Sequence, residues 1–188
     1  MSSSLLEHPI LRKQVMPMSV EMYHALGEMG LIQENVELLR GCILPKMSKS
    51  PRRTFVTQWL LNVILKLLPP GFWVRQEQPL TFADSQPEPD ISVVRGRFED
   101  YIAAHPRTAE IVVEVSISTM ERDVEKIGIY AEAGVKEYWL VIPEEKRVEI
   151  WTQPAAGGYS TCVRPGAGES YMSAAIPQLE ISWGEILA

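Results

Sequence analysis

Cysteine is scarce in this chain, whose 188 residues include only Cys42 and Cys162. The two lie far apart, neither belongs to a CxxC motif, and no histidine stands beside either of them. This spacing argues against a zinc site and against a disulfide framework. Because cytoplasmic proteins rarely use disulfides, we expect a reducing, cytoplasmic location.

Long hydrophobic runs are also missing. The most apolar stretch, residues 59–68, is interrupted by Asn62 and Lys66. It is far shorter than the roughly 20 residues that a membrane-spanning helix requires. The first residues, MSSSLLEHPILRK, lack the order of a basic segment followed by an apolar one that is typical of a signal peptide. We therefore expect neither a membrane span nor a secretory signal.

An excess of positive charge is the third absent feature. The formal net charge is −6, whereas nucleic-acid-binding proteins usually present a basic surface to phosphates. Carboxylates that bind Mg²⁺ count as negative in this sum, although the metal neutralises them. One cluster of basic residues contains no acid: Lys46, Lys49, Arg52 and Arg53. It predicts either a phosphate-binding segment or a solvated loop.

The composition itself is that of a folded protein, with 46% hydrophobic and 22% charged residues. Residues 1–16 are polar and irregular, and we expect them to form an N-terminal arm. The length of the remainder, residues 17–188, fits a single domain. No internal repeat or low-complexity tract is visible in it.

The hydrophobic pattern alternates between helical and extended periods along the chain. The predicted helices are residues 20–28, 51–68 and 120–133, with a last helical turn at 183–187. The predicted strands are residues 36–44, 72–78, 90–95, 111–116, 137–142 and 147–151, with an edge strand at 159–163. This order predicts an α/β fold with a mixed β-sheet flanked by helices.

Two helices show apolar stripes that should pack on the sheet. In the helix over residues 51–68 the stripe consists of Phe55, Trp59, Leu60, Val63 and Leu67. In the helix over residues 120–133 it consists of Met120, Val124, Ile127 and Ala131. Ser19 is placed to cap the first helix, and Ser118 and Glu121 have the spacing of a capping box.

Glu114 is the most unusual residue of the predicted central strand. Strand alternation directs Ile111, Val113 and Val115 to one face, and places Glu114 on the other face with Val112 and Ser116. A carboxylate in such an apolar strand is costly unless it is paired or bound to a cation. Glu114 is therefore either a metal ligand or a partner in an ion pair.

Asp90 is the natural second carboxylate. It follows Pro89 at the start of its own strand. If that strand lies beside the Glu114 strand, the two carboxylates can converge on one side of the sheet. Together with water they would offer the oxygen ligands that Mg²⁺ prefers. The alternative is that each carboxylate caps or pairs with a group near it.

A cation can come from the helix that follows. Asp123, Lys126 and Tyr130 have the spacing of residues on one helix face. Lys126 lies at the border of the apolar stripe, from which its long side chain could reach back toward Glu114. The alternative is an Asp123–Lys126 surface ion pair of little energetic weight.

Several segments also occur in an order typical of one known family. They are Ser19–Tyr23, Val36–Gly41, Pro87–Ile91, Glu114–Thr119, Arg122–Asp123, Lys126, Tyr130 and Ala133–Val141. Across residues 17–151 the chain thus resembles the Uma-type "putative restriction endonuclease" family. The resemblance implies the PD-(D/E)xK nuclease fold, with a restriction-endonuclease-like core of a mixed β-sheet flanked by helices.

The resemblance implies a catalytic set of Asp90, Glu114 and Lys126. The wider superfamily has a lysine two positions after the strand glutamate, where this chain has Ser116. In this family the lysine lies on the following helix, at the place of Lys126. The implied cofactor is Mg²⁺, with Mn²⁺ as a substitute, bound by Asp90, Glu114 and Glu37.

The same resemblance gives supporting roles and shows departures. Asp123 would orient Lys126, with Tyr130 as a further supporting residue. The family commonly has a histidine at the place of Arg53. The acid that usually follows the glycine of the Glu37 strand is replaced by Cys42, and an aspartate before the turn proline by Ile142. These departures leave the catalytic set intact but bear on its efficiency.

The expected function is metal-dependent hydrolysis of phosphodiester bonds, most simply in DNA, by an endonuclease that forms a homodimer. Lys49, Arg52 and Arg53 would contact phosphates outside the site, whereas the helical spacing of Phe55 and Trp59 indicates core packing rather than base stacking. Two alternatives stay open. One is a binding module that keeps the fold with an idle metal site. The other is a structural oligomer that buries Tyr138, Trp139 and Trp151 against a second copy.

Overall fold

The computed structural model describes residues 14–46, 50–116 and 121–184. Its helices are α2 (Val20–Glu28), α3 (Pro51–Leu67) and α4 (Glu121–Glu132), with short 3₁₀ turns η2 (Phe98–Tyr101) and η3 (Pro143–Glu145). Its strands are β1 (Val36–Leu39), β2 (Cys42–Pro45), β3 (Phe72–Gln76), β4 (Ile91–Arg95), β5 (Ile111–Val115), β6 (Glu137–Ile142), β7 (Arg147–Ala155), β8 (Gly158–Val163), β9 (Ser170–Met172) and β10 (Glu180–Ser182). The predictions for Lys49, Ser118, Met120 and the Glu121 side chain, and for most of the N-terminal arm, lie outside the described residues.

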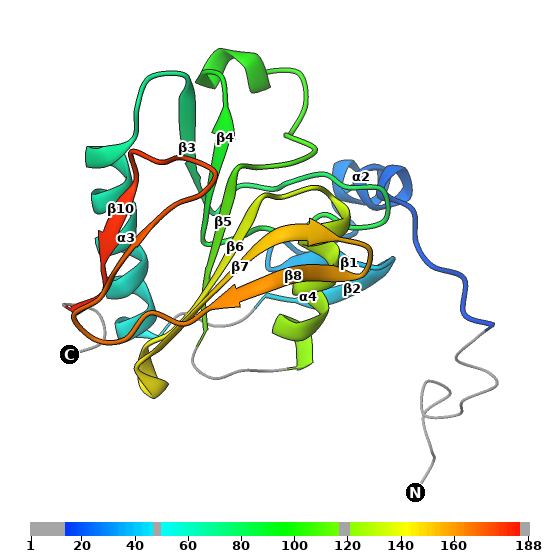
Figure 1. The fold of residues 1–188 in the computed structure, drawn as a ribbon. Helices are drawn as coiled ribbons and strands as arrows, with labels where there is room; N and C mark the ends of the chain where they lie inside the picture. Colours follow the sequence, from blue (N-terminus) through cyan, green and yellow to red (C-terminus); the bar gives the residue numbers. More distant parts are fainter. Residues whose placement is uncertain (1–13, 47–49, 117–120, 185–188) are drawn as a thin grey trace, which may run out of the picture.

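One mixed sheet organises the molecule (Figure 1). Its strand order is β3-β4-β5-β6-β7-β8. Strands β5 and β6 are parallel and are joined through α4, whereas the other neighbouring pairs are antiparallel. A parallel pair needs such a crossover connection, and the helix supplies it. The predicted α/β fold with a mixed sheet flanked by helices is confirmed.

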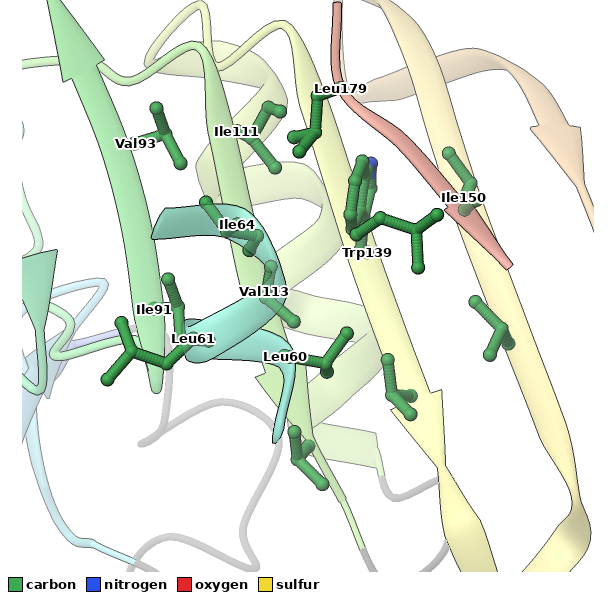
Figure 2. Close-up of a cluster of buried hydrophobic side chains, with 14 of the residues drawn as sticks. Leu60, Leu61, Ile64, Ile91, Val93, Ile111, Val113, Trp139, Ile150 and Leu179 are labelled. Carbon is green, nitrogen blue, oxygen red and sulfur yellow. The ribbon is translucent and has the colours of Figure 1, made fainter. Parts of the chain in front are cut away.

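Each face of the sheet has its own core. On one face, Leu60 and Ile64 of α3 pack over the sheet, as Figure 2 shows for the cluster around Ile111, Val113 and Trp139. Val112 points to the opposite face, into a cluster completed by Tyr130 of α4. The alternation predicted for the β5 segment is therefore correct, and Glu114 lies on the α4 side.

The apolar stripe predicted for α3 is only partly correct. Phe55 is 67% exposed, and the buried side chains of the helix are Val56, Thr57, Leu60, Leu61 and Ile64. Trp59 lies at the flank of this face and is only partly buried. The buried residues follow the i, i+4, i+8 row that consists of Val56, Leu60 and Ile64. The buried face of the helix is therefore displaced by about one residue from the predicted face. The interpretation of Phe55 as a core residue is wrong.

The strand predicted over residues 36–44 is a tight hairpin. Leu39 pairs with Cys42, so the loop consists of Arg40 and Gly41 alone. Both have positive φ, 51° and 72°, as the two-residue turns that match strand twist require. A Cβ atom at Gly41 would collide with Pro17. The hairpin folds β1 back on β2 and carries Glu37 in β1.

The C-terminal segment completes the core beside α3. Strands β9 and β10 pair with each other, and neither was predicted. Beyond them, Trp183 is fully buried, with its ring 5.9 Å from that of Trp139. The helical turn predicted for residues 183–187 lies mostly outside the described part of the chain.

The aromatic residues of the structural-oligomer alternative lie mainly inside this chain. Tyr138 and Trp139 are both 0% exposed, and Trp151 is partly buried. Tyr138 and Trp139 therefore cannot bury against a second copy, which contradicts that alternative in the form predicted. None of the helices in the described ranges has the length and apolar character of a membrane span.

Candidate active site

The two predicted carboxylates lie in one small pocket of about 160 Å³, where β4 begins and β5 ends. Strands β4 and β5 are adjacent and antiparallel, with Ile91 opposite Val113. This register places Asp90, just before β4, next to the end of β5 that carries Glu114. The pocket lining includes six acidic and four basic residues, which leaves a formal charge of minus two.

Asp90 is held by two elements. It is 4% exposed, and its Oδ2 atom accepts the backbone N–H of Val115 at 2.7 Å. Arg53 of α3 donates from Nη2 to both carboxylate oxygens, at 2.9 and 3.1 Å. Burial, followed by the nearby charge of Glu114, raises the pKa of Asp90 to about 6 and outweighs the opposing effect of Arg53. The two carboxylates therefore repel each other inside the pocket.

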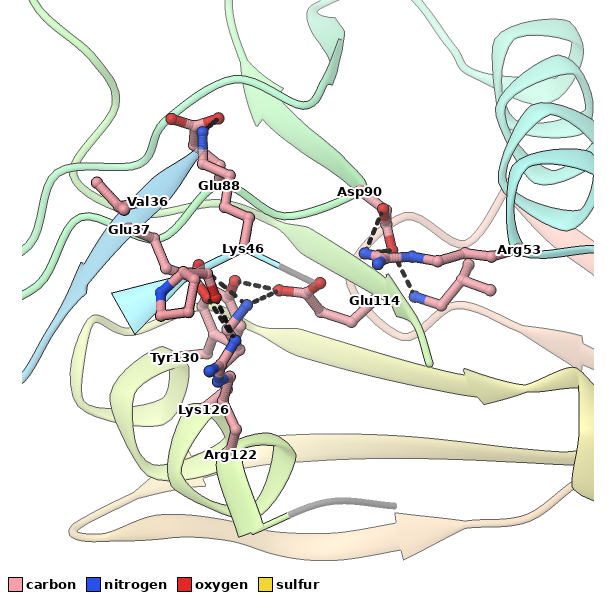
Figure 3. A network of polar contacts seen from close by, with 12 residues as sticks. Val36, Glu37, Lys46, Arg53, Glu88, Asp90, Glu114, Arg122, Lys126 and Tyr130 are labelled. Atoms are coloured by element: carbon pink, nitrogen blue, oxygen red, sulfur yellow. Dashed lines mark hydrogen bonds and ion pairs between the residues drawn. The ribbon is translucent and has the colours of Figure 1, made fainter. Parts of the chain in front are cut away.

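Glu114 and Lys126 form the centre of a buried polar network (Figure 3). The Nζ atom of Lys126 donates to Glu114 Oε1 at 2.9 Å and lies 3.1 Å from Glu37 Oε2. Tyr130 donates its hydroxyl to the same Glu114 oxygen at 2.8 Å. The lysine is 6% exposed, so its charge is shared between two glutamates with little screening by water.

The charge state of this network follows from its neighbours. Burial alone would lower the pKa of Lys126, but Glu114 and Glu37 reverse the effect and raise it. Burial and the charge of Glu114 raise the pKa of Tyr130. Lys126 is thus a cation and Tyr130 a protonated donor at neutral pH, and both fix the orientation of Glu114.

Helix α4 directs its polar stripe, not only an apolar one, toward the sheet. Asp123, Lys126 and Tyr130 are 5%, 6% and 0% exposed, whereas Val124 of the predicted apolar stripe is 58% exposed. The helix faces a pocket at its N-terminal half, so polar side chains there are buried with partners. Asp123 accepts the hydroxyl of Ser116 at 3.1 Å, and the alternative of a surface Asp123–Lys126 pair does not match this placement.

The predicted phosphate-binding cluster is divided by the fold. Arg53 lies within the pocket on Asp90, with a side chain only 13% exposed, rather than outside the site. Arg52 points away, donates to Pro143 O at 3.0 Å and lies 3.7 Å from Glu144. Lys46 pairs with Glu88 at 2.6 Å and lines the pocket. Lys49 falls outside the described ranges.

Sequence analysis missed several residues of the site. Arg53 was assigned to the wrong place, although its position corresponds to the histidine of the resembling family. Glu77, Glu88 and Arg122 also line the pocket, and Arg122 Nη1 lies 4.0 Å from Glu37. Glu88 and Arg122 lie in segments that carry the family resemblance, but no pattern in the sequence distinguishes the side chain of Glu77 from an ordinary surface charge.

The donor set suits a hard cation only after a rearrangement. Within the described ranges, no group of three or more His, Cys, Asp or Glu side chains is arranged to bind a metal as it stands. Asp90 is occupied by Arg53, and Lys126 lies between Glu114 and Glu37. Glu114 Oε2, however, accepts no hydrogen bond from a described residue. An all-oxygen set in a pocket of formal charge minus two fits one divalent ion such as Mg²⁺ once Arg53 releases Asp90.

Comparison with known proteins identifies a family and solved structures of similar fold. The model of the family Uma2, described as "Putative restriction endonuclease", matches residues 20–184. A crystal structure described as "a putative nuclease belonging to DUF820 from Anabaena variabilis ATCC 29413" is similar with a TM-score of 0.75 and 19% identity. The match covers 92% of this chain and 100% of that one. At this identity the likeness shows the fold alone. No curated protein matches.

Proposed function

Because the chain belongs to the Uma2 family, described as "Putative restriction endonuclease", we propose that it is a Mg²⁺-dependent endonuclease that hydrolyses phosphodiester bonds in DNA. The observation that carries the proposal is the convergence of Asp90, Glu114 and Lys126 in one buried pocket. Three separate chain segments contribute these charged side chains, and burying them is costly. A role in binding metal and substrate accounts for this cost. Homodimer formation and a cytoplasmic location stay predictions.

In the proposed mechanism, Asp90 and Glu114 would hold Mg²⁺, which supplies Lewis acidity toward the phosphate and an attacking water. Lys126 fixes Glu114 and places a positive charge beside the site at which charge grows on the phosphate oxygens. Tyr130 holds the same Glu114 oxygen and limits its rotation. Glu37 contacts Lys126 on the side away from Glu114, so in this geometry it affects the site by positioning the lysine.

The test of this function is cleavage of plasmid and single-stranded DNA with Mg²⁺, with Mn²⁺ and with EDTA. Glu114→Gln and Asp90→Ala should each lower metal-dependent cleavage about a hundredfold or more, since each removes a charged ligand. Glu110→Gln is the matched control. Glu110 directly precedes β5 and is also buried, but it pairs with Arg95 and Lys136, each at 2.8 Å, outside the pocket. Cleavage that survives in the Glu114 and Asp90 variants would contradict the assignment.

Arg53 should compete with the metal for Asp90. Arg53→Gln removes a positive charge that contacts both oxygens of the carboxylate, so the affinity for Mn²⁺ or Mg²⁺ should rise about tenfold. Isothermal titration with the metal alone measures this without any need for cleavage. Arg52→Gln is the control. Arg52 precedes Arg53 in α3, but its guanidinium donates to the backbone oxygen of Pro143 instead of to Asp90. Equal metal affinity in all three proteins would mean that Arg53 does not compete.

A binding module without catalysis is the second candidate. It is favoured by the pairing of Asp90, Glu114 and Glu37 with cations, which offsets the charge of these carboxylates without a metal. Such a protein would bind nucleic acid equally well in EDTA and would show no saturable metal binding. A measurable metal affinity that disappears in Asp90→Ala would exclude it.

A further inference from the structure

A second and larger cavity adjoins the candidate active site. It is a groove of about 910 Å³ between α2 and the chain segments that follow β3 and η2. Lys46 and Glu88 line both this groove and the pocket that contains Asp90. Their ion pair stands at the boundary of the two, beside Glu37 in Figure 3. A strand whose phosphate occupies the pocket would therefore continue into the groove.

Behind the wall of the groove lies a buried cation, Arg75, that forms no ion pair with an acid among the described residues. Arg75 is 3% exposed, and its Nη1 atom has no hydrogen-bond partner in the described part of the chain. Its guanidinium lies 5.6 Å from the centre of the Tyr101 ring and donates to Nδ1 of His105 at 3.2 Å. Tyr101 and His105 both line the groove. The guanidinium of Arg75 thus contacts the rings of both Tyr101 and His105.

These contacts determine the hydrogen-bonding character of the wall. A guanidinium can only donate, so Nδ1 of His105 accepts and the neutral ring has its proton on Nε2. Burial, and then the charges of Arg75 and His24, lower the pKa of His105, which keeps its ring neutral at neutral pH. His24 donates from Nε2 to the side-chain carbonyl of Gln86. The wall therefore offers neutral rings and donors rather than a row of positive charges.

The charges around the groove argue against a duplex backbone as its occupant. Six formally charged side chains line it: Glu21, Glu28, Glu34, Glu88, Lys46 and Arg107. The acids outnumber the bases, whereas duplex binding depends on neutralising many phosphates with cations. Unpaired bases are neutral and bind through ring stacking and contacts to their edges. Arg107 is exposed and is the cation available for an occasional phosphate.

We propose that the groove binds unpaired nucleotides of the substrate strand next to the bond that is cut, so that single-stranded or locally unpaired nucleic acid is the preferred substrate. This inference rests on the proposed nuclease function, because the strand enters the groove from the metal pocket. Tyr101 and His105 supply ring faces for the bases, and Arg107 contacts the backbone. The volume of the groove is large enough for more than one nucleotide.

Binding in EDTA tests the inference without cleavage. Fluorescence anisotropy would follow an end-labelled oligonucleotide of about twelve nucleotides, as single-stranded DNA, single-stranded RNA and duplex DNA. The wild type should bind one of the single strands at least about tenfold more tightly than the duplex, and the DNA and RNA arms identify the sugar. Arg107→Ala and Tyr101→Ala should weaken that binding about three- to tenfold. Arg97→Ala should not, because Arg97 is 78% exposed and lies outside the groove.

A small diester separates this inference from the proposed function. Bis(p-nitrophenyl) phosphate reaches the metal pocket but is too small to use the groove, so the wild type should hydrolyse it with Mn²⁺ whether or not the groove binds a single strand. Equal affinity for single strand and duplex, or unchanged binding in both groove variants, would overturn the inference even if the diester is hydrolysed. Failure of the wild type to hydrolyse any phosphodiester would instead count against the nuclease, while anisotropy would still decide what the groove binds.

Discussion

Replacing Lys126 with methionine should lower the free energy of unfolding of the metal-free protein by about 3–5 kcal/mol. Methionine keeps the unbranched shape and most of the length of the side chain and removes its charge. In the wild type the ammonium nitrogen lies 2.9 Å from Glu114 and 3.1 Å from Glu37, and both glutamates are buried. The substitution removes the positive charge that these two glutamates share. Urea-induced unfolding in EDTA, followed by tryptophan fluorescence, measures the change.

Lys136→Met is the matched control for this variant. Lys136 also bonds a buried glutamate, Glu110, at 2.8 Å, but its own side chain is 50% exposed. Water screens such a pair, so the loss should stay below about 1 kcal/mol. Divalent metal should stabilise Lys126→Met more than it stabilises the wild type or Lys136→Met, since only in Lys126→Met does the cation also neutralise glutamates that have lost their counter-charge. Equal losses in the two variants would contradict the central role of Lys126.

Trp139→Ala should cost about 3–5 kcal/mol of stability, as the removal of a fully buried tryptophan typically does. Its ring is 0% exposed and lies edge-on to Trp183 at 5.9 Å and to Tyr171 at 6.0 Å. Its indole N–H donates to Glu137 at 2.7 Å, so the truncation also removes a partner from a buried carboxylate. Thermal and urea unfolding would show the loss.

Trp73→Ala provides the comparison for this prediction. Trp73 lies on the edge strand β3 and is 37% exposed, so its removal should cost less than that of Trp139, about 2 kcal/mol. Sedimentation should give the same oligomeric state for Trp139→Ala, in its folded form, as for the wild type, because the ring lies inside the chain. A change of oligomeric state without a loss of stability would place Trp139 at an interface after all.

Much of the sheet could be predicted because its strands have strong local patterns. Ile111–Val115 is apolar and β-branched apart from Glu114, and Glu137–Ile142, beyond a helical segment, has an apolar run of its own. The same alternation predicted that Glu114 would face away from the Ile111 side, toward helix α4. Asp90 and Lys126 could be placed near it because the family motif and the sheet order agree.

Other features depend on contacts that local patterns do not contain. The Arg40–Gly41 turn lacks the Asn-Gly or Asp-Gly pair from which a hairpin with a two-residue loop is usually predicted. Strands β9 and β10 have three residues each, which is too short for a period to be visible. The buried side of α4 was misjudged in part because Asp123 and Lys126 find partners in the pocket, and hydrophobicity cannot predict that. Arg53 was misplaced since only the tertiary fold brings α3 to Asp90.

The burial of Trp183 has a consequence for the order in which the protein is synthesised. The core between α3 and the sheet includes Ile176, Leu179, Ile181 and Trp183, all of which come late in the chain. A ribosome makes β3 to β8 before these side chains exist, so the emerging chain exposes Trp139 and its neighbours until residues 176–183 have been made. Exposed apolar surface of this kind promotes aggregation and binding by chaperones. Helix α3 can cover part of the sheet early, but the final packing of this face has to wait until residues 176–183 have left the ribosome.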